Sequence, residues 1–271
     1  MSRTTAPRQA KIVLTLLLLS ALSWSPALAA PTHDRAIERQ RADLRKTNYG
    51  SRPFQTTQIF LGRQFMERML NMPSQQHLMD AGSGGHSELL TGHIVLRLRA
   101  GVSPAKTTAL GIEKPDPRGL ALLQKLNPQH QHLWGKFIEA YERGEIAPVH
   151  LMADQYGPFS YTDKPHKIIA AEGHLLAPGG ALFTHVTSSP TKTKAMTQIV
   201  DRSGRDVTMA WFNAIEGLRV IHDQAVQQGD LKIQQVGLER VGDGPIVAPK
   251  LTVEQFSDGH PPARRLLWDA N

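Results

Sequence analysis

Asp80 and the glycines after it are the residues whose types and spacing most directly suggest chemistry. The stretch "HLMDAGSGGH" (77–86) places an apolar pair before Asp80 and then supplies Gly82, Gly84 and Gly85. Glycines at the end of a strand allow a sharp turn and let a ligand approach the backbone without an intervening Cβ. A helix that starts after the turn adds free N–H groups and a positive dipole end. The spacing predicts a ligand site at a strand-to-helix turn, although any tight turn could have this composition.

Asp80 narrows the choice of ligand. A carboxylate two residues before the first glycine would repel a phosphate group and favours a ligand with a cationic part or with hydroxyl groups. The G-x-G-x-x-G spacing of dinucleotide sites is absent, because Ser87 stands three residues after Gly84, and no G-K-[ST] phosphate loop follows. These observations argue against a nicotinamide-dependent oxidoreductase.

The first 29 residues have the pattern of a secretory signal peptide. Three basic residues precede an apolar run of 13 residues (12–24), and Ala27 and Ala29 stand at positions −3 and −1 of a cut after Ala29. The run is too short for a comfortable membrane span, so we expect a periplasmic or secreted protein without a stable span after cleavage. An uncleaved anchor or a buried N-terminal helix is the alternative. The chain has no Cys, which fits an oxidising compartment and excludes disulfides and thiolate metal sites.

The charge of the chain gives little support to nucleic-acid binding. Removing residues 1–29 would leave 28 Lys and Arg against 24 Asp and Glu, a balance of +4, and no long basic block remains. The twelve His residues show neither an H-E-x-x-H pattern nor a helical pair with a third ligand, so we expect no metal site.

Strand-like and helix-like segments alternate along most of the chain. We expect a signal peptide (1–29), a charged lead-in (30–53), one α/β domain (54–260) and a short C-terminal tail (261–271). Apolar runs predict strands at 77–82, 107–113, 132–139, 148–154 and 181–188, and amphipathic or apolar periodicity predicts helices at 54–71, 86–101, 117–127, 163–180 and 207–228. Residues 231–258 complete the pattern as an extended pair around the turn "GDGP". The predicted fold is a doubly wound, mostly parallel seven-stranded sheet with an antiparallel C-terminal hairpin and helices on both faces.

The order of these motifs resembles that of class I S-adenosylmethionine-dependent methyltransferases. "LMDAGSGGH" is similar to their first motif, with His86 at the third glycine position and Gly85 one place early. "LGIEKP" resembles their second strand, "HLMADQYGPFSYTD" their fourth, and "IIAAEGHLLAPGGALFTHV" the helix, turn and fifth strand. The resemblance covers roughly residues 54–258.

The resemblance implies a cofactor, S-adenosylmethionine, and the residues that bind it. Those at the glycine turn would line its methionine and ribose end, and an acid after the second strand would hold the ribose hydroxyls; these residues are Asp80, Gly82, Ser83, Gly84, Gly85 and Glu113. Glu113 lies 33 residues after Asp80, against the roughly 20 expected, and we interpret residues 93–106 as an insertion. Glu113 could equally be a solvated acid before a turn.

The stretch "DQYGPFSY" (154–161) supplies the catalytic candidates. Asp154 could act as a base or as an acceptor-side ligand, and Tyr156, with Phe159 and Tyr161, could form a substrate wall. The alternative is a strand-end turn in which Phe159 and Tyr161 pack into the core.

Two functions remain from the sequence. The first is an exported S-adenosylmethionine-dependent methyltransferase that acts on an unknown acceptor, a small molecule or a protein. The second is a catalytically inactive binding or interaction module on the same fold, since a fold does not fix a function. Export favours the second, because the methyl donor is made in the cytoplasm. Whether the chain is an enzyme is therefore left open.

Overall fold

The computed structural model describes residues 54–83, 87–189, 197–255 and 264–269. The signal peptide, the charged lead-in, Gly84 and Gly85 lie outside these residues. The helices and strands follow one another as α3 (Phe54–Leu70), β1 (His77–Asp80), α4 (Glu88–Arg99), β2 (Lys106–Gly111), α5 (Pro117–Leu126), β3 (His130–Trp134), α6 (Phe137–Glu142), β4 (Val149–Asp154), α7 (Pro158–Tyr161), α8 (Pro165–Leu175), β5 (Leu176–Ser188), β6 (Ile199–Val200), α9 (Thr208–Asn213), β7 (Leu218–Gln228), β8 (Leu231–Arg240), β9 (Thr252–Gln255) and β10 (Arg264–Leu267). No helix in these ranges is long and apolar enough to cross a membrane.

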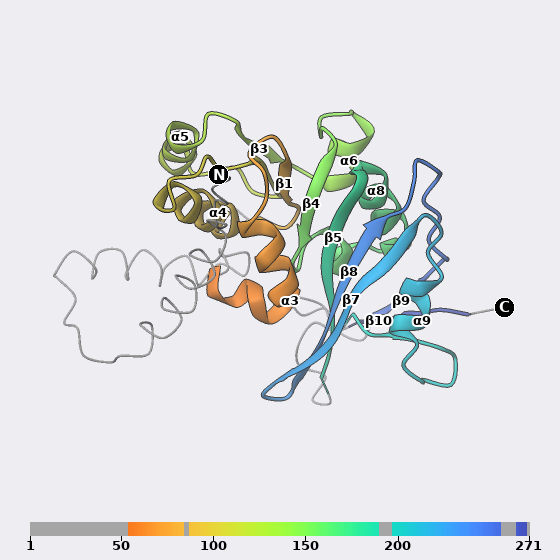
Figure 1. The fold of residues 1–271 in the computed structure, drawn as a ribbon. Coiled ribbons are helices and arrows are strands. Elements are labelled where there is room, and N and C mark those ends of the chain that lie inside the picture. Colours follow the sequence, from red (N-terminus) through yellow and green to blue (C-terminus); the bar gives the residue numbers. More distant parts are fainter. Residues whose placement is uncertain (1–53, 84–86, 190–196, 256–263, 270–271) are drawn as a thin grey trace, which may run out of the picture. The chain divides into compact units, whose positions relative to one another are not determined.

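Seven strands form the main sheet, in the order β3-β2-β1-β4-β5-β8-β7 (Figure 1). The first five are parallel, and β8 runs antiparallel to both β5 and β7. The four residues of β1 are all buried, as expected for a central parallel strand, and Asp80 at its end pairs with Ala109 and Ala153. The predicted doubly wound sheet with a final antiparallel pair is thus confirmed.

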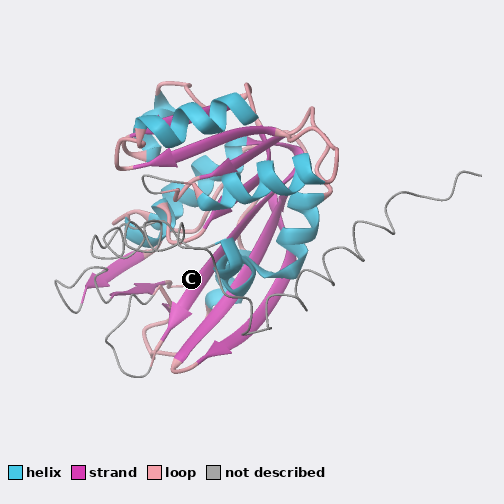
Figure 2. Ribbon diagram, turned by 90° about the vertical axis from the view of Figure 1, so that its left-hand side faces the viewer, coloured by secondary structure: helices cyan, strands magenta, loops and turns pink. Residues whose placement is uncertain are grey.

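Helices cover both faces of this sheet (Figure 2). Neighbouring residues of β5 show which helices lie on which face, because successive side chains of a strand point to opposite sides. The ring of Phe183 contacts Phe65 of α3, with centroids 5.5 Å apart. Leu182 instead belongs to the core cluster that contains Ile168 of α8 and Trp211 of α9. Helix α3 therefore covers one face, and α8 and α9 cover the other.

The helices that precede and follow β2 start at side-chain caps. Ser87 accepts a hydrogen bond from the backbone N–H of Leu90 (3.2 Å) and begins α4. Asp116 accepts one from Gly119 (2.8 Å), and Pro117 occupies the first turn of α5. Both caps satisfy N–H groups that a helix leaves without an internal partner. Helix α4 occupies much of the segment interpreted as an insertion, so residues 93–106 are not an insertion but the end of an ordinary βαβ crossover.

The predicted long helix over 207–228 is wrong. Helix α9 ends at Asn213, and the following residues form β7, the edge strand of the main sheet. Gly217, with a φ of 79°, turns the chain between the two elements. The final hairpin consequently joins β7 to β8, and residues 252–255, predicted to pair with 231–240, belong to another sheet.

That second sheet was not predicted. It contains β6, β10 and β9 in this order, with β10 parallel to β6 and antiparallel to β9. Its strands are short, and β6 has two residues, which leaves little periodicity to detect in the sequence. Residues 264–267, assigned to the C-terminal tail from the sequence, form the central strand β10. The predicted strand over 132–139 is also only partly correct, because β3 ends at Trp134 and α6 begins at Phe137.

Candidate functional site

A cavity of about 770 Å³ lies at the carboxyl ends of β1, β2, β3 and β4. The strand order places β2 on one side of β1 and β4 on the other, so the chain reverses direction across the sheet here. Ligands of open α/β sheets bind at such a switch point, outside the carboxyl ends of the strands. The volume is in the range of small-molecule and cofactor sites. This cavity is therefore the candidate ligand site.

Asp80 stands at the edge of the cavity, and its carboxylate organises the first turn. One oxygen accepts a hydrogen bond from the backbone N–H of Gly82 (3.2 Å), and the other accepts one from the hydroxyl of Ser87 (2.9 Å). Since Ser87 also caps α4, one side chain joins Asp80 to the start of the helix. Ser83 donates its backbone N–H to the carbonyl of Leu110 in β2 (3.0 Å). Asp80, Gly82 and Ser83 all line the cavity.

The turn after β4 forms the facing wall. Asp154 is fully buried and accepts hydrogen bonds from the backbone N–H groups of Gly157 (2.7 Å) and Phe159 (3.0 Å). Asp154 is not among the residues that line the cavity, whereas Gln155, Tyr156, Gly157 and Pro158 are. Its carboxylate therefore fixes the shape of the turn from behind.

Tyr156 is the candidate from this turn that does face the cavity. Its φ of 51° is positive, an uncommon conformation for a residue other than glycine and one that is often found at functional sites. Its ring meets the imidazole of His185 edge-on, with centroids 4.4 Å apart, and lies 5.0 Å from the ring of Phe60 in α3. These contacts fix the aromatic ring at the wall.

Glu172 lies behind the same turn. It is fully buried on α8, and burial raises the pKa of its carboxyl group well above 4.5. The charge of Asp154 and a hydrogen bond between the two carboxyl groups raise this pKa further. If both carboxyl groups were ionised, neither oxygen of Glu172 would have a hydrogen-bond donor in the described part of the chain. Asp154 and Glu172 thus form a buried carboxyl pair in which burial and the neighbouring charge favour the protonated form of Glu172.

The walls of the cavity combine apolar and charged side chains. Apolar residues lie at the end of β2, just after it and at the start of α6, and charged residues of both signs stand around them. The apolar set includes Leu110, Ile112, Phe137 and Ile138; the acids are Asp80, Glu88, Glu142 and Asp163, and the bases are Lys136, Lys164 and Lys167. Such a lining suits a ligand that carries both a flat apolar part and charged or hydroxylated parts.

The structure separates the residues that were predicted to act together. Asp80, Gly82, Ser83 and Tyr156 line one cavity. Glu113 follows β2, is exposed and is not among the lining residues. Of the two aromatic residues of uncertain role, Phe159 is fully buried in the core, and Tyr161 is 42% exposed at the cavity.

Sequence reasoning missed several wall residues. Thr57 comes from α3, which was predicted without a role in the site. Glu88 comes from the first turn of α4, whose N-terminus was expected at the ligand turn but without this side chain. Glu142 and Lys167 come from later helices. A charged residue in the first turn of a helix after a glycine turn is a signal that could have indicated Glu88. Thr57 carries no comparable signal, because it is distant from the glycine turn in sequence and lies in an ordinary amphipathic helix.

Two buried histidines, His77 and His93, bond to other parts of the fold. His77 bonds the carbonyl of Pro148 (3.0 Å) and the hydroxyl of Thr108 (2.8 Å). His93 accepts the N–H of Ala105 (3.2 Å), and burial, with the nearby charge of Arg97, lowers the pKa of His93 to about 4. Within the described ranges, no group of three His, Asp or Glu side chains could hold a metal ion.

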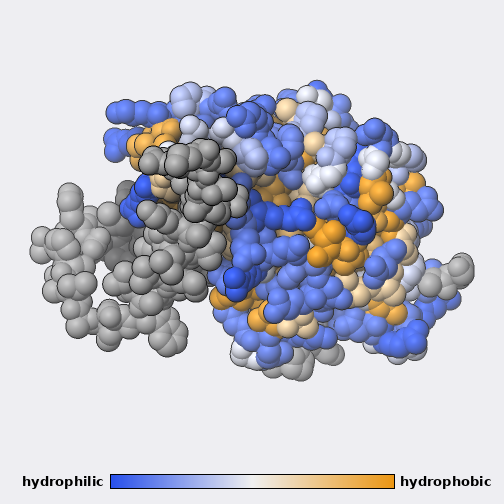
Figure 3. All heavy atoms as spheres, in the orientation of Figure 1, coloured by the Kyte–Doolittle hydropathy of each residue, from blue (hydrophilic) through white to orange (hydrophobic). Residues whose placement is uncertain are grey.

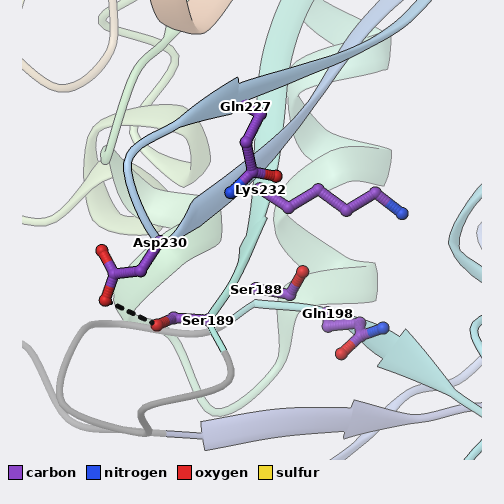
Figure 4. A pocket seen from close by; sticks show the side chains of 6 residues that line it. All are labelled: Ser188, Ser189, Gln198, Gln227, Asp230 and Lys232. Atoms are coloured by element: carbon purple, nitrogen blue, oxygen red, sulfur yellow. Dashed lines mark hydrogen bonds between the residues drawn. The ribbon is translucent and has the colours of Figure 1, made fainter.

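A second, smaller cavity of about 380 Å³ lies where β5 ends beside the turn between β7 and β8. Figure 4 shows its polar lining, which is Ser188, Ser189, Gln198, Gln227, Asp230 and Lys232. The Ser189 hydroxyl donates a weak hydrogen bond to Asp230 (3.4 Å).

The surface seen in Figure 3 is mostly hydrophilic, with hydrophobic side chains in smaller areas.

Comparison with known proteins finds similar solved structures only. No family model matches the chain, and no curated protein is similar to it in sequence. An O-methyltransferase family protein from Burkholderia thailandensis is 14% identical, with a TM-score of 0.41 over 87% of this chain and 70% of its own. The precorrin-6y C5,15-methyltransferase from Geobacter metallireducens is 13% identical, with a TM-score of 0.38 over 66% and 87%. The [4+2]-cyclase SpnF is 13% identical, with a TM-score of 0.44 over 66% and 79%.

Proposed function

We propose that this protein binds S-adenosylmethionine in the cavity beside β1 and transfers its methyl group to an acceptor. The observation that carries the proposal is the position of Asp80 and Gly82, which together line a cavity at the switch point between β1 and β4. The acid there favours a cationic or hydroxylated ligand over a phosphate, as the sequence already indicated.

The lining of the cavity fits the cofactor in kind. Its sulfonium and ammonium groups are cationic and would lie near Asp80 and Glu88, and its adenine is flat and would suit Ile112 and Phe137. When bound, the cofactor supplies an electrophilic methyl group. The protein's own task is then to orient the reactants and exclude water. Tyr156, held by His185 and Phe60, would form the wall beside the acceptor.

Asp154 has a different role in this proposal from the one predicted. Because both of its oxygens accept backbone hydrogen bonds and it does not line the cavity, we assign it to positioning the turn that carries Tyr156. No other base is assigned, since methyl transfer to a neutral amine or an ionised acceptor requires alignment rather than prior proton removal.

Isothermal titration of the whole chain with S-adenosylmethionine and S-adenosylhomocysteine tests the proposal. We expect saturable binding of both, and at least tenfold weaker binding by Asp80→Asn, which keeps the shape of the side chain but removes its charge. Asp243→Asn is the matched control, because Asp243 is exposed and is not among the residues that line the cavity. Absence of binding to the wild type at millimolar ligand would exclude the proposed cofactor.

The alternative is a catalytically inactive binding module on the same fold. The exposure of Glu113 favours it, since the expected ribose acid does not reach the cavity. Radiolabelled methyl transfer to a panel of small molecules and proteins distinguishes the two. Binding without transfer to any acceptor, including proteins of the source cell, would support the module.

We also propose that the protein is exported, on the basis of the signal-like order of residues 1–29. Fusion of this segment to a reporter that is active only outside the cytoplasm tests this independently of the cofactor. An active fusion that loses activity when Arg3, Arg8 and Lys11 are replaced by Glu supports export, and an inactive fusion contradicts it.

A further inference from the structure

One wall of the cavity is a short helical segment whose backbone is held by side chains from other parts of the fold. Helix α7 has only four residues, and the segment around it supplies Gly157, Pro158, Tyr161 and Thr162 to the lining. So short a helix leaves most of its backbone groups without internal partners, and it is not stable by itself. Its position therefore depends on groups outside it.

Buried ionisable side chains hold both ends of this segment. At its start, the Asp154 carboxylate accepts the N–H groups of Gly157 and Phe159. At its end, the guanidinium of Arg264 donates to the carbonyls of Phe159 (2.7 Å) and Thr162. The positive charge lies at the carboxyl end of the helix, where the backbone dipole favours a cation.

Arg264 comes from a different sheet. It is the first residue of β10, the central strand of the small sheet, and only 3% of it is exposed. The buried Leu266 of the same strand belongs to the main core cluster, which fixes β10 against the domain. Burial lowers the pKa of Arg264 to about 10, and Tyr161 and Asp163 act against this shift; because this pKa still lies well above 7, Arg264 stays a cation at neutral pH. A buried cation of this kind is costly unless its bonds are well made.

We propose that Arg264 is a positioning residue for the ligand cavity, and that the small sheet fixes the α7 wall through it. The planar guanidinium reaches two carbonyls on the same segment at once, which a single-point donor could not do with the same geometry. The affinity measurement below rests on the proposed function. The exchange measurement does not, because the α7 wall is present without a ligand.

Hydrogen exchange of the ligand-free whole chain tests the wall directly. In Arg264→Met we expect the amides of residues 159–162 to exchange about tenfold faster, while amides of β1 keep their rate, because the wall then opens locally. Arg264→Lys keeps the charge but places its donors on a single nitrogen, so it should fall between the wild type and Arg264→Met. If Arg264→Met does not fold, the comparison of Arg264→Lys with the wild type decides the same question.

Arg265→Met is the matched control. Arg265 is the next residue of β10, but it pairs with Glu254 of β9 (2.8 Å), within the small sheet. We expect it to leave exchange in residues 159–162 unchanged. Equal exchange in the Arg264 and Arg265 variants would overturn the proposal, even if both lower the overall stability.

Affinity for S-adenosylhomocysteine gives a second readout, measured well below the unfolding temperature. If the wall is correctly placed in only about a tenth of Arg264→Met molecules, the Kd rises about tenfold. An unchanged Kd with a lowered melting temperature would show a purely structural role and contradict the proposal. If the wild type itself does not bind, the proposed cofactor fails, and the exchange comparison still decides the role of Arg264.

Discussion

Gly82 and Gly157 pack backbone against backbone between the turn after β1 and the turn after β4. A Cβ on Gly82 would lie 2.8 Å from the α-carbon of Gly157 and 3.0 Å from the carbonyl oxygen of Gln155. A Cβ on Gly157 would lie 3.1 Å from the α-carbon of Gly82. Both contacts are with rigid backbone, so neither can be relieved by a side-chain rotation. The two turns that line the cavity are close enough only because both residues lack a side chain.

Gly82→Ala is therefore expected to push the two turns apart. Overpacking of this kind costs about 1–3 kcal/mol in the free energy of unfolding, and it should weaken ligand binding as well. Urea denaturation and titration measure the two effects. Gly244→Ala is the control, because a Cβ there meets no atom within 4 Å and should leave both quantities unchanged. Equal stabilities of the two variants would show that the turns are not in close contact.

The proton on the buried carboxyl pair predicts how stability depends on pH. The pKa of Glu172 is raised in the folded protein, so the folded state holds a proton that the unfolded state releases above about pH 4.5. This contribution is complete below that value and is lost as the pH rises toward the raised pKa, at up to about 1.4 kcal/mol per pH unit. Glu172→Gln stays neutral, so the decline should disappear.

Chemical denaturation of the wild type and of Glu172→Gln between pH 5 and 8 measures this difference. This range lies above the ordinary carboxyl pKa of about 4.5. Gln can also donate a hydrogen bond to Asp154, so we expect the variant to be the more stable protein at the upper end of the range. The exposed Glu113→Gln serves as the control. Parallel pH profiles for the wild type and Glu172→Gln would mean that Glu172 is ionised in the folded protein.

The parts of the fold that were predicted correctly are those in which local pattern and tertiary role agree. The buried run before Asp80 and the helix after Ser87 are visible as an apolar stretch and as amphipathic or apolar periodicity. Strand β7 was predicted incorrectly as helix, because its apolar residues have a helix-like spacing and directly follow α9. Only Gly217 marks the change from helix to strand. The tertiary environment overrode the local pattern there.

The candidate site could be predicted from the sequence only in part. The glycine turn was visible because a close backbone approach requires glycine, and Gly82 meets that requirement against Gly157. The position of Asp154 was not, since a buried acid that holds a turn and an acid that faces a ligand look the same in sequence. Arg264 lies more than 100 residues from the carbonyls it holds, and no local signal connects them.

Two buried histidines predict a loss of stability in acid. Burial lowers the pKa of both His93 and His130 to about 4, with smaller contributions from the charges of Arg97 and His132, respectively. The unfolded chain binds these protons near pH 6.5, so the contribution is complete above that value and is lost as the pH falls toward 4. Each site contributes up to about 3 kcal/mol above pH 6.5, and this contribution is lost by about pH 4.

Unfolding free energies test this acid effect. They are measured for the wild type and for the double variant His93→Gln and His130→Gln from pH 7 to 4.5, a range that includes the ordinary histidine pKa of about 6.5. The variant should be less stable at neutral pH, since it alters buried hydrogen bonds, but it should lose less stability on acidification. A wild type and a variant with the same acid slope would show that these histidines are accessible to protons in the folded state.

Gln235 holds a break in α3, the helix that brings Thr57 to the cavity. Gly62, with a φ of 86°, interrupts the helix. The carbonyls of Gln58 and Ile59 would accept hydrogen bonds from residues 62 and 63 in a continuous helix. They instead accept the side-chain amide of Gln235 at 3.3 and 2.7 Å. His222 bonds the other end of that amide (3.1 Å), which fixes its orientation.

Gln235→Ala should therefore leave two carbonyls without their donor and loosen the first half of α3. We expect a loss of about 1 kcal/mol in the free energy of unfolding and faster hydrogen exchange in the helix before Gly62, because two partly buried carbonyls lose the donor that Gln235 supplies. Gln234→Ala is the neighbouring control, since Gln234 points away from α3 and bonds Asp223 at the exposed surface of β7. If the two alanine variants were equally stable and exchanged equally in residues 56–61, the break in α3 would have to be held by its own sequence rather than by β8.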